Sequence, residues 1–194
     1  KKKKTISLPS PKNINNKVDY AKTRALADSE ALRLKCSDVN IYSSFEPAGS
    51  TSRLLYAAAE KIRYEDIGSS YFKGVKQNLD YFYTNKSKKK VEDKNKDYEF
   101  INAFVYYLRT NISKFNTDKE SENKYKKYKK QLDAQLKDKI GALSNSLLDQ
   151  RKFNALISKI ISQLKIDESI DSEQKENDQE DTDNLENKAK DETN

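Results

Sequence analysis

One stretch of the chain carries a complete helical pattern: Leu55-Tyr56-Ala57-Ala58-Ala59-Glu60-Lys61-Ile62-Arg63-Tyr64-Glu65-Asp66-Ile67-Gly68. The apolar residues that share one face at helical spacing are Leu55, Ala58 and Ile62. Ser50 or Thr51, just upstream, is expected to cap the free N–H groups at the beginning of the helix. Gly68 is a natural place for it to end, because glycine tolerates the left-handed backbone found at helix C-termini. The pattern therefore predicts an amphipathic helix over residues 50–68.

Helical patterns flank this stretch on both sides. Upstream, from about Asp19, one apolar stripe consists of Ala21, Ala25, Leu32, Cys36 and Val39. Glu46-Pro47-Ala48-Gly49 ends that region, since proline and glycine interrupt helices. Downstream, Gly74 precedes a further helical run, whose apolar residues are Val75, Leu79 and Phe82.

The second half of the chain contains three more helical patterns. The first runs from about Asp97, with an apolar set made of Ile101, Phe104, Val105, Leu108 and Ile112. Thr117 with Glu120 matches a capping box. It opens a long helix whose stripe is Tyr125, Tyr128, Leu132, Leu136, Ile140, Leu143 and Leu147, a pattern that also fits a helical hairpin or a coiled-coil arm. The last helix, about Asp149 to Lys165, should bury Phe153, Leu156, Ile157, Ile160, Ile161 and Leu164.

Together these patterns predict an all-α fold. No segment shows the strict alternation of apolar and polar residues that is typical of a half-buried strand. The one-sided stripes suit helices packed around a single core. We therefore expect residues 18–166 to form one helical domain, an irregular bundle of about five to six helices.

Charge divides the chain into a basic body and an acidic C-terminal segment. The 194 residues carry a formal net charge of +7, and only 35% of them are hydrophobic. From Asp167 onward there are twelve acids against three lysines, a net of −9, so the first 166 residues carry a net of +16. Residues 1–17, interrupted by Pro9 and Pro11, are expected to be a flexible basic arm. Residues 167–194 are expected to be a disordered acidic linker.

The composition argues against several classes of site. The chain has no histidine, the usual general base near neutral pH and the commonest metal ligand. Its one cysteine, Cys36, cannot form an internal disulfide or a cysteine-rich zinc site. No apolar run is long enough for a membrane span or fits a signal peptide, and no Gly-rich loop for ATP phosphates is present. We therefore expect a cytoplasmic protein without catalytic, cofactor-binding or metal-binding residues of its own.

Arginine is the unusual cation in this sequence, because lysine outnumbers it by 32 to 6. Arg63 follows Glu60 by three residues, so the two side chains share a helical face and can pair. With Glu65, they would form either an interface site or an intramolecular ion pair that orients the helix. We favour the ion pair, because partly buried pairs are often structural.

Three further features allow a functional and a structural interpretation, and the structural one is favoured for each. Gly68 and Gly74 are interpreted as a helix stop and a close-packing site, in preference to hinges. Cys36 lies on an apolar stripe and is interpreted as a small core residue. The Lys86–Lys96 run lacks interleaved aromatic residues, so it is interpreted as a solvated loop and not as a nucleic-acid site.

Two groups of motifs are more specific than helical periodicity requires. The first comprises Arg24-Ala25-Leu26-Ala27-Asp28, Ala31-Leu32-Arg33-Leu34, Asp38, the Leu55–Gly68 stretch, Gly74-Val75 and Asn78-Leu79. The second is Leu147-Leu148-Asp149-Gln150-Arg151-Lys152-Phe153, shortly before the acidic segment. In order and spacing they resemble the N-terminal region of the CobT subunit of aerobic cobaltochelatase, the cobalamin biosynthesis protein CobT family. The resemblance covers roughly Arg24–Leu79 and Leu147–Leu164.

The chain departs from the family pattern at two places. Tyr56 stands where the family has a phenylalanine, and Cys36-Ser37 stands where it often has histidines, which puts any metal role there in doubt. The family's von Willebrand factor A-type domain is not among these 194 residues.

The resemblance implies a non-catalytic assembly or regulatory region of a vitamin B12 enzyme complex, a ligase forming nitrogen–metal bonds. The complex inserts cobalt into hydrogenobyrinic acid a,c-diamide at the expense of ATP. ATP with Mg²⁺ belongs to an AAA+ CobS-like partner, and cobalt and the corrin belong to a large CobN-like partner, so a hetero-oligomer is expected. The candidate interface or structural residues are Arg24, Asp28, Arg33, Arg53, Glu60, Arg63, Glu65, Gly68, Gly74, Asn78, Asp149, Gln150 and Arg151.

Two alternatives remain open. The same domain would serve a different metalloprotein client if the source genome lacked the large chelatase subunit. A lysine-rich helical adaptor would instead bind nucleic acid or an anionic surface, and its binding would weaken steeply with salt. We consider nucleic acid and membrane to be the less favoured partners.

Overall fold

The computed structural model describes residues 17–85, 96–115 and 119–164, and these residues form helices without any strand. The helices are α1 (Lys17–Cys36), α2 (Val39–Phe45), α3 (Ser50–Tyr71), α4 (Lys73–Thr84), α5 (Lys96–Leu108), α6 (Lys119–Leu136), α7 (Ile140–Asn145) and α8 (Gln150–Gln163). A π-helical turn, η2 (Arg109–Ser113), continues α5, and a 3₁₀ turn, η3 (Lys137–Lys139), follows α6. The all-α prediction is confirmed.

Four predictions fall on other parts of the chain. Outside the described residues lie residues 1–16 of the predicted basic arm, most of the Lys86–Lys96 run, the capping role of Thr117 and the acidic linker of residues 167–194. They stay predictions. Lys17, predicted as the last residue of the arm, is instead the first residue of α1.

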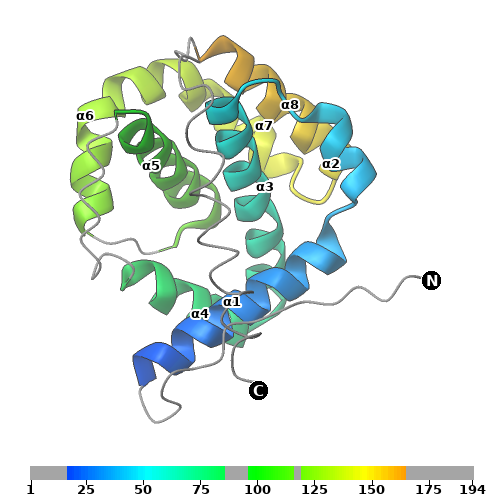
Figure 1. Ribbon diagram of the computed structural model, residues 1–194, viewed down its shortest axis with the longest axis vertical. Coiled ribbons are helices and arrows are strands. Elements are labelled where there is room, and N and C mark those ends of the chain that lie inside the picture. Colours follow the sequence, from blue (N-terminus) through cyan, green and yellow to red (C-terminus); the bar gives the residue numbers. More distant parts are fainter. Residues whose placement is uncertain (1–16, 86–95, 116–118, 165–194) are drawn as a thin grey trace, which may run out of the picture.

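Helix α3 lies at the centre of the molecule (Figure 1). It packs against α1, α4, α5 and α8, and its apolar face enters a core that it shares with α5, α6 and α8. The members of this core with no measurable exposure include Leu55, Tyr56, Phe104, Leu132, Leu136, Phe153 and Ile157. A smaller cluster joins α1 to α4 through Ala25, Leu79 and Tyr83, with Phe115. Helix α3 therefore contributes to the larger core and packs against the two helices, α1 and α4, that form most of the smaller one.

The N-terminal helical region is divided in two, which corrects the single stripe expected from Ala21 to Val39. Helix α1 ends at Cys36, and Asp38 caps α2 by accepting hydrogen bonds from the backbone N–H groups of Asn40 (2.7 Å) and Ile41 (3.3 Å). Val39 consequently points outward, with 68% of its surface exposed. The apolar spacing continues to Val39, but the helix does not, because Asp38 caps the beginning of a new helix at this point.

Helix α3 begins where expected, but Ser50 and Thr51 do not cap it. The cap position belongs to Gly49, which makes no side-chain hydrogen bond and has a φ of 89°. That left-handed backbone favours glycine, because a Cβ would clash there. Pro47 and Gly49 thus set the turn, as their sequence indicates, while the predicted hydroxyl cap was wrong.

The predicted roles of Gly68 as a helix stop and Gly74 as a close-packing site were both wrong. Helix α3 passes through Gly68 and ends only at Tyr71. A Cβ on Gly68 would overlap the end of the Leu32 side chain, so this glycine is the close-packing site between α1 and α3. Gly74 has nothing within 4 Å of its Cβ position and lies in the first turn of α4. Glycine often ends a helix, but Gly68 lies within α3, where it allows close packing against Leu32.

The stripe from Tyr125 to Leu147 is divided between two helices. Helix α6 ends at Leu136, and η3 separates it from the short α7. Helix α6 packs along α5 as a helical hairpin (Figure 1), which was one of the two predicted arrangements. No helix among the described residues is long and apolar enough to cross a membrane.

Candidate polar networks and an adjoining pocket

Two buried carboxylates lie on different faces of α3. Glu60 and Glu65 are five residues apart, which places them well over 90° apart around a helix. Their exposed fractions are 3% and 0%. A buried carboxylate needs a cationic partner or several hydrogen-bond donors. Each of these two has both, and each therefore organises a separate polar network.

The Glu60 network contains the ion pair that the sequence spacing predicts. Arg63 donates from Nε to Glu60 Oε2 (2.8 Å) and from Nη2 to Glu60 Oε1 (2.7 Å). Arg63 is 1% exposed, so the pair is shielded from water. Ser37 Oγ donates a third hydrogen bond to Glu60 Oε1 (2.6 Å). This geometry is the planar, two-pronged contact that arginine makes and lysine cannot copy.

Arg63 also connects chain segments that are distant in sequence. Its Nη2 donates to the carbonyl oxygen of Cys36 at the end of α1 (2.5 Å). Its Nη1 donates to the carbonyl oxygen of Leu147, just before α8 (3.0 Å). Carbonyls near helix ends lack partners within the helix. One guanidinium therefore holds α1, α3 and the segment that leads into α8 together.

Gln150 completes this network from the first residue of α8. Its Oε1 accepts from the backbone N–H of Asp38 (2.7 Å), and its Nε2 donates to the backbone oxygen of Asp38 (3.1 Å) and to Glu60 Oε1 (3.2 Å). An amide side chain is suited to this role because it offers both a donor and an acceptor. The junction between α1 and α2 is thereby fixed against α8.

The Glu65 network joins α3 to α1, α4 and η2. Glu65 Oε1 accepts from Ser29 Oγ (2.7 Å), and Tyr83 Oη donates to both carboxylate oxygens (2.8 and 2.9 Å). Arg109 Nη1 lies 3.6 Å from Glu65 Oε2, and its Cζ lies 3.3 Å from the centroid of the Tyr83 ring. Burial raises the pKa of Tyr83, so its hydroxyl stays a hydrogen-bond donor.

This second network corrects the grouping of Glu65 with Glu60 and Arg63. The cations near Glu65 are Arg109, at 3.6 Å, and Lys61, whose Nζ lies 4.0 Å from Oε1. Arg109 is the buried one, with 5% exposure, and was not among the candidate residues. A signal for it was available, since Arg109 is the one arginine in a lysine-rich middle region. No local spacing rule, however, connects it to Glu65, which lies 44 residues earlier in the sequence.

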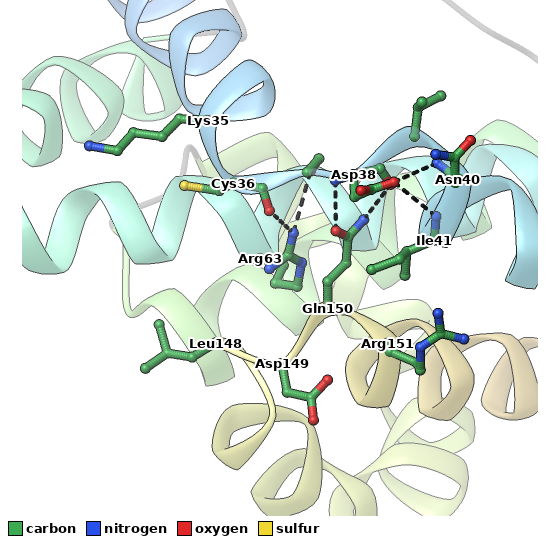
Figure 2. A pocket seen from close by; sticks show the side chains of 12 residues that line it. Lys35, Cys36, Asp38, Asn40, Ile41, Arg63, Leu148, Asp149, Gln150 and Arg151 are labelled. Atoms are coloured by element: carbon green, nitrogen blue, oxygen red, sulfur yellow. Dashed lines mark hydrogen bonds between the residues drawn. The ribbon is translucent and has the colours of Figure 1, made fainter.

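An open pocket of about 860 Å³ adjoins the Glu60 network, between the α1–α2 junction and the beginning of α8 (Figure 2). Its lining residues are Lys35, Cys36, Ser37, Asp38, Val39, Asn40, Ile41, Arg63, Leu148, Asp149, Gln150 and Arg151. Two of them are exposed aliphatic side chains, Val39 at 68% and Leu148 at 77%. Exposed apolar side chains beside a depression are typical of surfaces that bind another molecule.

A comparison with protein families matches the whole chain, residues 1–194, to the family model described as cobalamin biosynthesis protein CobT. The chain belongs to the CobT family. No solved structure matches it. Membership places the chain in cobalamin biosynthesis and agrees with the resemblance carried by its two groups of motifs.

The two groups of CobT-like motifs meet in space at the Glu60 network. Glu60 and Arg63 come from the first group, and Leu147 and Gln150 come from the second, about ninety positions later in the sequence. The spacing that identifies the CobT resemblance is therefore also the spacing that closes a buried network. Glu60, Arg63, Leu147 and Gln150 therefore have a structural role in the fold that does not depend on a catalytic one.

Cys36 of this CobT family member is not the core residue that the sequence predicted. Its side chain is half-buried and lines the pocket, while its backbone oxygen accepts from Arg63. The helix ends at this residue, so the apolar stripe no longer determines which way the side chain points. No group of three or more potential metal ligands occurs among the residues that the structure describes.

The remaining α1 candidates lie away from the pocket. Arg24 is 4 residues before Asp28 and pairs with it at 3.4 Å, and Asn78 Nδ2 donates to Asp28 from α4 (2.8 Å). Arg33 pairs with Glu30 at 2.8 Å on the exposed side of α1. Arg24 and Asp28 with Asn78 therefore help to join α1 to α4.

Three candidates remain near the surface of α3 and α8. Arg53 is exposed on the first turn of α3. Asp149 caps α8 by accepting from the backbone N–H of Lys152 (3.0 Å). Arg151 is exposed, and its Cζ lies 6.0 Å from the centroid of the Phe45 ring in α2. Of these, Asp149 and Arg151 line the pocket and Arg53 does not.

Proposed function

We propose that this chain is a non-catalytic assembly region of an ATP-dependent cobaltochelatase, and that its pocket surface binds the AAA+ subunit of that complex. Cobalt is a substrate of the proposed reaction, handled with the corrin by the large subunit. ATP with Mg²⁺ is bound by the AAA+ subunit. Family membership supports the pathway, and the pocket supports the specific surface.

One observation carries the surface assignment. The residues of both motif groups build a rigid, buried network directly beneath a pocket that exposes Val39 and Leu148. A docking site needs walls that keep their shape and an apolar contact that loses water on binding. The network provides the first, and the two aliphatic side chains provide the second.

Charge at the pocket fits a partner segment that combines carboxylates with apolar residues. Lys35 and Arg151 are exposed cations of its lining. Asp38 and Asp149 each cap a helix, because their carboxylates accept hydrogen bonds from backbone N–H groups of the first turn. Lys35 and Arg151 are therefore the two exposed cations that carboxylates of a partner could contact at the pocket, with Asp38 and Asp149 beside them.

The test is co-purification of the chain with the AAA+ subunit, with and without ATP, followed by light scattering. A pocket variant combines Leu148→Asp with Arg151→Glu. A matched control combines Tyr71→Asp with Arg53→Glu, which changes one exposed apolar residue and one exposed arginine outside the pocket. Arg63 is unsuitable as a contact variant, because its burial means that a substitution would test the fold.

The expected result is a nucleotide-dependent hetero-oligomer for the wild type and the control. The pocket variant should bind at least about tenfold more weakly, the loss typical of a central interface contact. Equal binding by both variants would reject the pocket as the contact surface. Absence of any complex with the wild type, together with salt-sensitive binding of polyanions, would favour the adaptor function instead.

A different metalloprotein client remains the second candidate function. It keeps the AAA+ interaction and replaces only the protein on which the complex acts. The two functions are separated by adding the large chelatase subunit to the purified complex. Cobalt insertion into the corrin supports the chelatase, and failure of the large subunit to associate supports another client.

A further inference from the structure

One face of α6 carries a dense run of exposed lysines. Between Asn123 and Leu132 the sequence contains five lysines and no acid. These lysines are followed by Lys137 in η3, directly after the helix. The exposed members of the set, which we call the α6 lysine face, are Lys126, Lys127, Lys129, Lys130 and Lys137.

Leu132 and Leu136 turn inward to the core, and α6 packs mainly against α5. Helix α6 lies at the edge of the molecule in Figure 1, and the lysines of this face are exposed among the described residues. Lys126 pairs with Glu122 at 3.2 Å, and Lys127 pairs with Glu99 at 2.5 Å. Lys129, Lys130 and Lys137 pair with no carboxylate of the described residues. At least three exposed lysines of α6 and η3 thus form no ion pair with the described residues.

The same chain contains a segment of opposite charge that begins close to this face. Residues 167–186 hold ten acids and one lysine, a net of −9. They start three residues after Leu164, where the described structure ends. Lys139, which ends η3, donates from Nζ to Gln163 Oε1 at 2.7 Å. The end of α8 is therefore beside the end of α6.

We propose that the acidic segment of residues 167–186 binds the α6 lysine face of its own chain. The length is sufficient: α6 has 18 residues and is about 27 Å long, while twenty extended residues span at most about 70 Å. Attachment at the end of α8 gives the segment a high effective concentration at this surface. The pocket is a poorer site, because its two exposed cations lie beside Asp38 and Asp149.

The contact depends on charge and consequently on ionic strength. Interactions between exposed charges extend over about 8 Å at physiological salt and about 3 Å at 1 M salt. The segment should therefore cover the α6 lysine face at low salt and leave it at high salt. While bound, it would keep other polyanions from the α6 lysine face.

The test measures where the acidic segment lies in the full chain. Cys36→Ser removes the only cysteine, and Ser172→Cys then allows one nitroxide label to be attached within the segment. Paramagnetic broadening of backbone amide signals reports which helices are near the label. A variant with Lys129, Lys130 and Lys137 changed to Gln is compared with a control in which Lys22, Lys73 and Lys152, exposed lysines of three other helices, are changed to Gln.

The expected result is broadening of α6 amides at low salt that is lost at about 1 M salt. It should be lost in the α6 variant and kept in the control. Broadening centred on the α1–α2 junction, or unchanged by the α6 variant, would overturn the proposal. A mixture of isotope-labelled chains without nitroxide and unlabelled chains with nitroxide should show no broadening. Broadening in that mixture would assign the contact to a second copy and reject the intrachain form.

Discussion

Arg63 is the residue on which the greatest number of segments depends. Its three nitrogen atoms donate to Glu60, to the Cys36 and Leu147 carbonyls and to Ser37, at 1% exposure. The sequence identified this arginine through its rarity and its spacing from Glu60. It could not identify the two carbonyl acceptors, because backbone atoms have no sequence signature. The local pair was therefore predictable, and the long-range part was not.

Arg63→Ala should destabilise the protein by about 3–5 kcal/mol, since it leaves Glu60 buried without its cation. Arg63→Lys should also destabilise, because an ammonium cannot reproduce the two-pronged contact. Urea unfolding followed by circular dichroism measures both. Arg53→Ala, at an exposed position of the same helix, is the control and should stay within about 0.5 kcal/mol of wild type. A loss below 1 kcal/mol for Arg63→Ala would contradict the structural role.

Gly68 and Gly74 should respond in opposite directions to alanine. Gly68→Ala places a methyl group against Leu32 and should cost about 1–3 kcal/mol, as overpacking does. Gly74→Ala meets no neighbour and should be neutral or stabilising by less than about 1 kcal/mol, through helix propensity. Thermal and urea unfolding measure both. In a Leu32→Ala background the cost of Gly68→Ala should disappear, and its persistence would point to another cause.

At the scale of elements, apolar periodicity located the long helices but not their interruptions. The breaks at Ser37-Asp38 and at Lys137–Lys139 contain neither proline nor glycine, so no strong punctuation marks them. Asp38 carried a usable signal, because aspartate is a preferred N-cap, but the stripe through Val39 concealed it. At α8 cap and stripe agree, and there the prediction of a helix after Asp149 was right.

Asp149→Ala should destabilise the protein by about 1 kcal/mol, since it removes the hydrogen bond to the Lys152 N–H at the first turn of α8. The effect should extend to the pocket, because Gln150 is the next residue. Hydrogen exchange at the α1–α2 junction, compared between variant and wild type, checks this. Asp138→Ala in η3 removes an exposed carboxylate that does not line this pocket, and it should leave the exchange there unchanged.

At the scale of the whole molecule, several tyrosines lie in buried positions, where loss of the phenolic proton is unfavourable. Burial raises the pKa of Tyr42 and of Tyr107 to about 12. Burial raises the pKa of Tyr56, Tyr64 and Tyr83 as well, with nearby Glu60 adding to the effect at Tyr56. In the unfolded chain a tyrosine ionises near pH 10. The folded state therefore keeps protons that the unfolded state releases.

Stability should consequently fall as the pH rises from about 10 to 12, because in that window the folded state binds more protons than the unfolded state. Below pH 10 this contribution is fully present. Urea unfolding at a series of alkaline pH values, with tyrosinate absorbance recorded in parallel, gives the slope. Tyr107→Phe should reduce that slope. An increase of stability across the same interval would show that the tyrosines are not protected.

The bridge made by Arg63 also has a consequence for synthesis of the protein. Cys36, Glu60 and Arg63 leave the ribosome long before Leu147 and Gln150, which complete the same network. A nascent chain that has emerged only as far as α6 already holds the Glu60–Arg63 ion pair, but it lacks the Leu147 carbonyl and the Gln150 amide that complete the hydrogen bonding of the pair. We therefore expect the junction between α1 and α2 to be fixed only after α8 has been synthesised. Chaperone protection during translation matters most in that interval, and prematurely terminated chains that lack α8 are natural targets for proteolysis.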